Sequence, residues 1–120
     1  MVRTENIGPK SVIVVDVENM KSDQTQEIIE TLQQARKLVA KQPEKSVYII
    51  TIVTNVKFNN DISNAFKQYA SSNTKYVKES IIVGLGGLQT VVFSAIKALT
   101  KREFHLTGTL DEAKKLMATL

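Results

Sequence analysis

The stretch of residues 76–99, YVKESIIVGLGGLQTVVFSAIKAL, constrains the fold more than any other part of this chain. An apolar, β-branched run at residues 81–83 leads into three closely spaced glycines. A helical repeat then begins, with one apolar face that comprises Leu88, Val91, Val92, Ala95, Ile96 and Leu99. A strand, a glycine turn and a helix in this order form the unit from which α/β sheets are built.

The rest of the chain repeats this unit. Strand patterns begin near residues 12, 47, 77 and 104, and a helical pattern follows each of them. Candidate N-terminal caps of three of the helices are Ser22 or Asp23, Asn60 or Asp61, and Thr109, which has Glu112 at capping-box spacing. Four successive β-α steps predict an α/β fold with a mainly parallel sheet and right-handed crossovers.

Two segments need further explanation. Residues 1–10 are polar and contain the turn signal Gly8-Pro9, so we expect an N-terminal arm or a short edge strand before a single domain at residues 11–120. The strand at residues 47–53 is apolar on both alternating faces, so both faces must be buried. Because same-handed crossovers place their helices on one face, the other face needs the N-terminal arm, a shifted helix or a second subunit.

The composition excludes several classes of protein. A chain of 120 residues suits one domain, and without cysteine it has no disulfides or thiolate metal site. It has neither an apolar run of the ~20 residues that span a membrane nor a secretory signal pattern, so we expect a cytoplasmic protein. The net charge is +4, but the lysines are scattered and tryptophan is absent, so we expect no nucleic-acid binding.

Two segments carry a family resemblance: VIVVDVENMKS before a long helix, and VGLGGLQTVVFSAIKALTKREFHLTGTLDEAKKLMA. The shared pattern is a strand that ends in Asp, Gly-x-x-Gly-Leu at a helix start, a basic residue before a short strand, and a Thr-x-x-Glu-Ala helix. These positions are Asp16, Gly84, Gly87, Leu88, Arg102, Thr109, Glu112 and Ala113. From residue 11 onward the chain thereby resembles the SpoIIAA-like family, relatives of the STAS and SEC14 folds. With the four β-α steps, the resemblance implies a four-stranded sheet in the order 1-2-3-4.

For function, the resemblance implies a small non-enzymatic regulatory or binding module. The relation to SEC14 implies an alternative, a carrier or sensor of an apolar, lipid-like ligand that associates with membrane surfaces. Phosphoswitching relatives carry Asp-Ser-Ser-Gly at the start of the helix after their central strand. The matching residues 56–63, VKFNNDIS, lack the paired serines and the glycine, and Ser63 lies inside the expected helix. We therefore predict no serine phosphoswitch.

Three groups of residues suggest chemistry, and each has a simpler structural interpretation. The glycine turn invites a phosphate, but Gln89 occupies the third glycine position of a dinucleotide fingerprint, so a tight turn is favoured. Asp16 and Glu18 lie on one side of a strand end, but the next strand end supplies no third acid for Mg²⁺. His105 has no evident nucleophile or orienting partner. We expect no catalytic residue, metal or cofactor.

The candidate residues for binding a ligand or partner are Gly84, Gly86, Gly87, Phe93, Lys97 and Lys101. Phe93 lies about 140° from Leu88 on a helical wheel, beside the two lysines. It either packs sideways against a neighbouring helix or forms an exposed aromatic that docks on an anionic membrane surface or a second subunit. The expected partner is a protein, including a second copy, or an apolar small ligand. An apolar pocket of a few hundred Å³ would favour the carrier, and a solid core the partner-binding module.

Overall fold

The computed structural model describes residues 1–120, except for the side chain of Leu88. The elements in chain order are β1 (Val2–Ile7), β2 (Lys10–Asp16), a short 3₁₀ helix η1 (Ser22–Gln24), α1 (Thr25–Val39), β3 (Val47–Ile52), α2 (Asn60–Asn73), β4 (Val77–Val83), α3 (Leu88–Thr100), β5 (His105–Thr107) and α4 (Leu110–Thr119). Within the described residues, no helix combines the length and the apolar character needed to cross a membrane.

The sheet has the order β1-β2-β3-β4-β5 in the described chain, with β1 antiparallel to β2 and the other pairs parallel. The prediction of four strands is therefore wrong by one, and the sheet is mixed. The additional strand is the N-terminal arm, which confirms the alternative of an edge strand. Gly8 has a φ of +60° in the turn that joins β1 to β2. The other strands follow one another across the sheet in chain order, as predicted.

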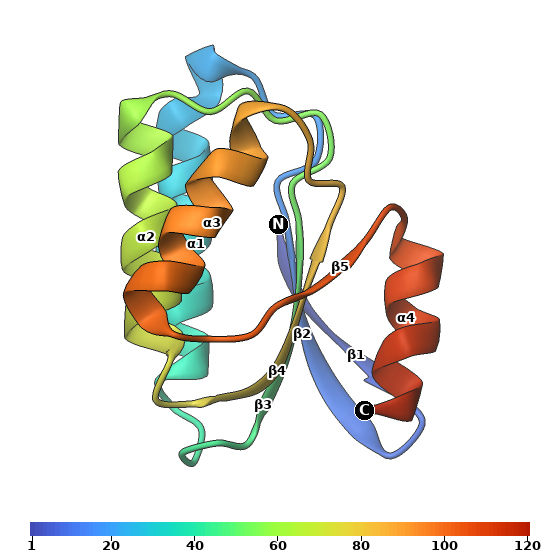
Figure 1. Cartoon of the computed structure of the whole chain (residues 1–120). Coiled ribbons are helices and arrows are strands. Elements are labelled where there is room, and N and C mark those ends of the chain that lie inside the picture. Colours follow the sequence, from blue (N-terminus) through green and yellow to red (C-terminus); the bar gives the residue numbers. More distant parts are fainter.

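The helices form two unequal layers (Figure 1). Helices α1, α2 and α3 cover one face of the sheet, as same-handed crossovers require, and α4 covers the other. Strand β3 is buried on both faces, and Ile50 and Ile52 pack with Ala113 and Met117 of α4. A shifted helix thus supplies the cover that the apolar strand demands. Helix α4 can take this side because it follows the last strand and crosses to no other.

The predicted apolar stripe of α3 is wrong in its phase. Val91 and Leu99 are 66% and 65% exposed, whereas Phe93 and Ile96 are buried. The helix is apolar around most of its circumference, so its pattern alone does not fix which side faces the sheet. Packing of Phe93 determines which side of α3 is buried, because the centroid of its ring lies 5.7 Å from that of Phe66 on α2.

The helix starts agree in part with their predicted caps. Thr109 Oγ1 accepts a hydrogen bond from Glu112 N at 3.2 Å, which confirms the start of α4. The cap of α2 is Asn59, one residue earlier than expected, and its side chain accepts from Ile62 N at 2.8 Å. The η1 turn precedes α1, so neither Ser22 nor Asp23 is the cap of α1 in the described chain.

Candidate functional site

The glycine turn after β4 brings two strand ends close together. Gly84 has a φ of +83°, and a Cβ added there would lie 2.8 Å from Thr54 Cα. Its N–H donates to Thr107 O at 2.9 Å, which ties the turn to β5. Gly87 caps α3 with a φ of +54°. Close backbone packing therefore accounts for Gly84, and a left-handed conformation for both glycines.

Gln89 holds the glycine turn against the loop that follows β3. Its buried side chain donates from Nε2 to Val53 O at 3.0 Å and to Val56 O, and its Oε1 accepts from Gly86 N at 3.2 Å. Sequence reasoning noted Gln89 only as a missing glycine. Its position on the same face as Phe93 and Ile96 is the signal that would have identified it, once the phase of α3 was known.

The strand order also bears on the phosphate interpretation. Open α/β sheets bind nucleotides in the crevice where the strand order reverses and successive helices diverge to opposite faces. In the described backbone the order runs in one direction, and α1, α2 and α3 share one face. The glycine turn therefore lies in a continuous helical layer, which favours its role as a tight turn.

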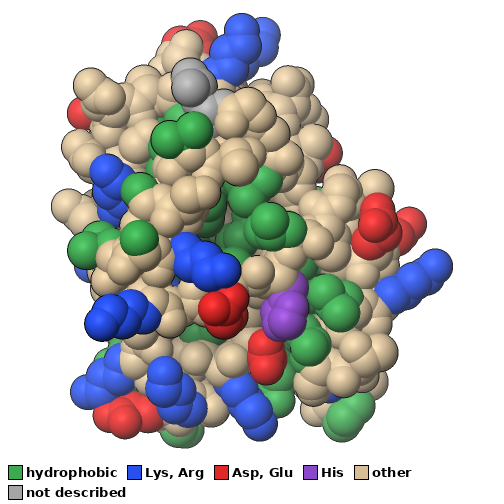
Figure 2. Space-filling model, viewed as in Figure 1, with side chains coloured by type: hydrophobic (Ala, Val, Ile, Leu, Met, Phe, Trp, Pro, Cys, Tyr) green, Lys and Arg blue, Asp and Glu red, His purple; other side chains and the backbone are tan. Residues whose placement is uncertain are grey.

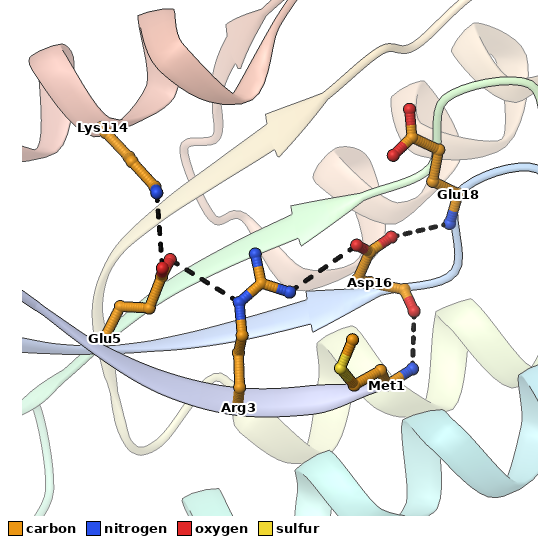
Figure 3. Close-up of polar contacts among 6 residues, drawn as sticks. All are labelled: Met1, Arg3, Glu5, Asp16, Glu18 and Lys114. Carbon is orange, nitrogen blue, oxygen red and sulfur yellow. Dashed lines mark hydrogen bonds and ion pairs between the residues drawn. The ribbon is translucent and has the colours of Figure 1, made fainter.

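Asp16 belongs to a chain of polar contacts that links β1, β2 and α4 (Figure 3). Its Oδ1 accepts from Glu18 N at 2.9 Å, and its Oδ2 lies 3.7 Å from Arg3 Nη1. Arg3 Nε lies 3.7 Å from Glu5 Oε2, and Lys114 Nζ lies 3.3 Å from Glu5 Oε1. Across the described residues, no three acids or histidines gather as a metal would need. Asp16 instead holds a loop and an edge strand.

His105 pairs with Glu79 of the neighbouring strand. Its Nε2 lies 3.0 Å from Glu79 Oε2, and both side chains are about one-third exposed. His105 also faces Ile81 across the ladder, and Ile81 belongs to the core beneath α4. The sequence named no partner for His105, since Glu79 lies 26 residues away. The pair fastens β5 to β4.

An apolar groove lies between α3 and β5, and we call it the β5 groove. It measures about 210 Å³ and is lined by Leu85, Thr90, Phe93, Ser94, Lys97, Phe104 and Leu106. Figure 2 shows hydrophobic side chains gathered in a hollow on this side of the molecule. Leu106 is 60% exposed, and the exposed Lys97 lies 3.1 Å from Glu103 through its Nζ. The groove is thus an open apolar surface with one ion pair at its rim.

The candidate binding residues separate in the structure. Phe93 and Lys97 line the β5 groove, whereas Lys101 lines a different hollow with Arg102. Gly86 borders a third hollow beside Phe58. Phe93 is only 6% exposed and packs against Phe66 and Phe104, which contradicts the exposed-aromatic interpretation and confirms sideways packing. Phe93 is the floor of the groove.

Arg102 supports the groove wall at Phe104, a role that sequence reasoning did not assign to it. The Arg102 guanidinium lies 4.8 Å from the centre of the Phe104 ring, and its Nη1 donates to Ala70 O at 2.9 Å. Burial lowers the pKa of Arg102. Burial likewise raises the pKa of Tyr69, whose hydroxyl is 2.9 Å from Thr51 Oγ1. The contacts of Arg102 link the Phe104 ring of the groove wall to the backbone of α2.

Comparisons with known proteins bear on the fold. No family model matches the sequence. No curated protein matches it either. The structure is similar to the crystal structure of an uncharacterized protein of the DUF3478 family, with a SpoIIAA-like fold, from Shewanella loihica PV-4. The TM-score is 0.64 at 16% sequence identity, and the match covers 98% of this chain and 92% of the other. The chain therefore has a SpoIIAA-like fold, as the resemblance in its sequence implied.

Proposed function

We propose that this chain is a small non-enzymatic binding module that engages a protein partner through the β5 groove. The observation that carries the proposal is the groove itself, in which Leu85, Phe104 and the 60% exposed Leu106 form an open apolar surface over Phe93. Exposed apolar surface on a small protein is commonly an interaction site.

The contacts of the polar candidates support a role in binding over a role in catalysis. Asp16 is occupied by Arg3 and the Glu18 backbone, and His105 by Glu79. Gln89 uses its amide on backbone groups. Each of these groups has a structural partner within the fold. We also propose that the module works without a serine switch, because Ser63 lies within α2 and residues 56–63 lack the paired serines.

The size of the groove favours a protein partner over a carried lipid. Sites that enclose a drug-sized ligand usually measure ~300–1,000 Å³ and bury most of its surface. The β5 groove measures about 210 Å³. Four further hollows on the described surface, of about 310 to 380 Å³, each have a lysine or arginine in the wall. The core consists of two clusters of buried apolar side chains, one on each face of the sheet.

A photo-crosslinking experiment in cells tests the proposal. A benzophenone amino acid in place of Ser94, which is exposed and lines the groove, should yield a discrete protein adduct on irradiation. Leu106→Asp should abolish that adduct. Val91→Asp, an equally polar change at a 66% exposed position outside the groove wall, should preserve it.

Solvent extraction and mass spectrometry of the purified chain address the carrier. The proposal predicts that no lipid co-purifies in stoichiometric amount. If a lipid co-purifies in stoichiometric amount and is lost in the Leu106→Asp variant, the lipid carrier is favoured over the protein-binding module. If Leu106→Asp leaves the crosslinked adducts unchanged, the β5 groove is not the binding site.

A further inference from the structure

Strand β5 leaves one side of its backbone open. Thr107 O accepts from Gly84 N, so the polar groups of Thr107 face β4. Successive residues of a strand direct their backbone groups to opposite sides, and this turns the N–H and C=O of Leu106 toward the open edge. In the described sheet β5 is the last strand on this side. The edge therefore offers one donor and one acceptor to an incoming strand.

The side chain of Leu106 lies beside that open ladder position. Leu106 pairs with Ile82, whose side chain belongs to the core beneath α1, α2 and α3, so Leu106 lies on the α3 side of the sheet. There it lines the β5 groove and remains 60% exposed. An incoming strand would therefore find backbone partners and an apolar surface at the same residue, as strand addition requires.

The charged side chains beside the β5 groove indicate which kind of incoming strand can pair with β5. Lys97 of the groove wall forms an ion pair with Glu103, and 56% and 81% of their side chains are exposed. A strongly acidic or strongly basic partner would meet one like charge here. A second copy of the chain brings the same balanced pair, so each lysine can face a glutamate across a two-fold axis.

We propose that β5 pairs with β5 of a second copy, antiparallel, about a two-fold axis that passes beside Leu106. This inference rests on the proposed function, because it names the partner of the same groove. The residue on the axis must present its own N–H and C=O outward, so that the two copies exchange both hydrogen bonds. Leu106 meets this condition. Its side chain then lies next to Leu106 of the second copy, and the two grooves form one apolar seam.

The opposite edge of the sheet is less suited to this role. Strand β1 carries Arg3 and Glu5, which pair with Asp16 and Lys114 (Figure 3). Charged side chains on an edge strand discourage pairing with another sheet. The outer face of α3 has the exposed Val91 and Leu99, but no backbone groups that need partners. The β5 edge combines both features.

Sedimentation equilibrium of the purified full chain tests the proposal, from low micromolar to near-millimolar concentration. The wild type should show a monomer–dimer equilibrium. Leu106→Asp should raise the dimer dissociation constant at least ~100-fold, because it places two carboxylates opposite each other on the axis. The matched control Val91→Asp should leave the constant unchanged. Leu106 is exposed, so the variant should fold, and its circular dichroism verifies this.

Two outcomes would overturn the proposal. A wild type that stays monomeric throughout the range excludes the second copy. A dimer that Val91→Asp dissociates and Leu106→Asp does not would place the interface on α3. If the wild type is monomeric while the adduct at position 94 contains a different protein, the binding module stands and only its partner changes. If neither a dimer nor an adduct forms, both proposals fail.

Discussion

The two edge strands of the sheet, β1 and β5, differ in the side chains that flank their unpaired backbone groups. Strand β1 has six residues, and its Arg3 and Glu5 side chains join it to Asp16 of β2 and Lys114 of α4. Strand β5 has three residues, and at its centre Leu106 is 60% exposed. Charged side chains protect the β1 edge from pairing with another strand. The β5 edge is protected by its short length and by His105, which pairs with Glu79. This difference is the basis for proposing that another strand pairs at the β5 edge and not at the β1 edge.

The supports behind the edges differ as well. The β1 edge combines apolar contacts of Val2 and Ile7 with polar contacts among Arg3, Glu5 and Asp16, whose side chains are about one-quarter exposed. The β5 edge depends on packed rings, since Phe93 lies 5.7 Å from Phe66 and 6.2 Å from Phe104, centroid to centroid. We therefore expect substitutions of the buried rings under the β5 groove to lower the free energy of unfolding strongly. Substitutions of exposed residues at its surface should change that free energy little.

The largest expected effect is that of Phe93→Ala. Because Phe93 is the buried floor of the groove, the change should lower the free energy of unfolding by ~3–5 kcal/mol. Leu99→Ala, on the same helix but 65% exposed, should change it by less than about 0.5 kcal/mol. Urea denaturation measures both. A larger loss for Leu99→Ala than for Phe93→Ala would mean that α3 has the other phase.

A second prediction concerns the stability of the fold at alkaline pH. Burial raises the pKa of Tyr69 above its ordinary value of 10.0, so the folded chain keeps a proton that the unfolded chain loses. Stability should therefore fall above pH 10, by about 1.4 kcal/mol per pH unit from this group, until the folded phenol ionises.

Urea denaturation at several alkaline pH values measures this slope. Tyr69→Phe should make the slope shallower by that amount, although it also removes the hydrogen bond to Thr51. Tyr76→Phe removes a tyrosine hydroxyl while leaving Tyr69 in place, and serves as the matched control. A Tyr69→Phe variant with the full wild-type slope would show that Tyr69 titrates alike in both states.

The smallest stability effect is expected at the β1 edge. Glu5→Gln removes the charge that faces Arg3 and Lys114, and should cost about 1 kcal/mol at low salt and less at high salt. Glu30→Gln, on the exposed surface of α1, should cost almost nothing. Denaturation at two salt concentrations checks this. A salt-independent loss at Glu5 would mean that packing, not charge, holds β1 in place.

The fold could be predicted from the sequence to the extent that its signals are local. The four β-α steps, the two-sided burial of β3 and the cap at Thr109 follow from runs of a few residues. Residues 1–10 were harder to assign, because the inward-facing Arg3 and Glu5 of β1 pair with residues distant in the chain. The phase of α3 depends on Phe66, which no pattern within α3 reveals.

The candidate site was predictable only in part. The sequence nominated Phe93 and Lys97, and both line the β5 groove, but for Phe93 it left open an exposed position that is wrong. Leu106 and Phe104 were not nominated as binding residues. Their importance comes from the position of β5 at the end of the sheet, and that position follows from the strand order as a whole.

Hydrogen exchange at the two edges tests the central contrast most directly. Met1 and Asp16 exchange backbone hydrogen bonds, so alternation along β1 turns the Thr4 amide toward open solvent, as it does the Leu106 amide on β5. NMR can follow both amides across a concentration series of the wild-type chain. We expect the Leu106 amide to gain protection as concentration rises, while the Thr4 amide exchanges rapidly throughout. Protection that grows at Thr4, or at neither amide, would contradict the proposed pairing at β5.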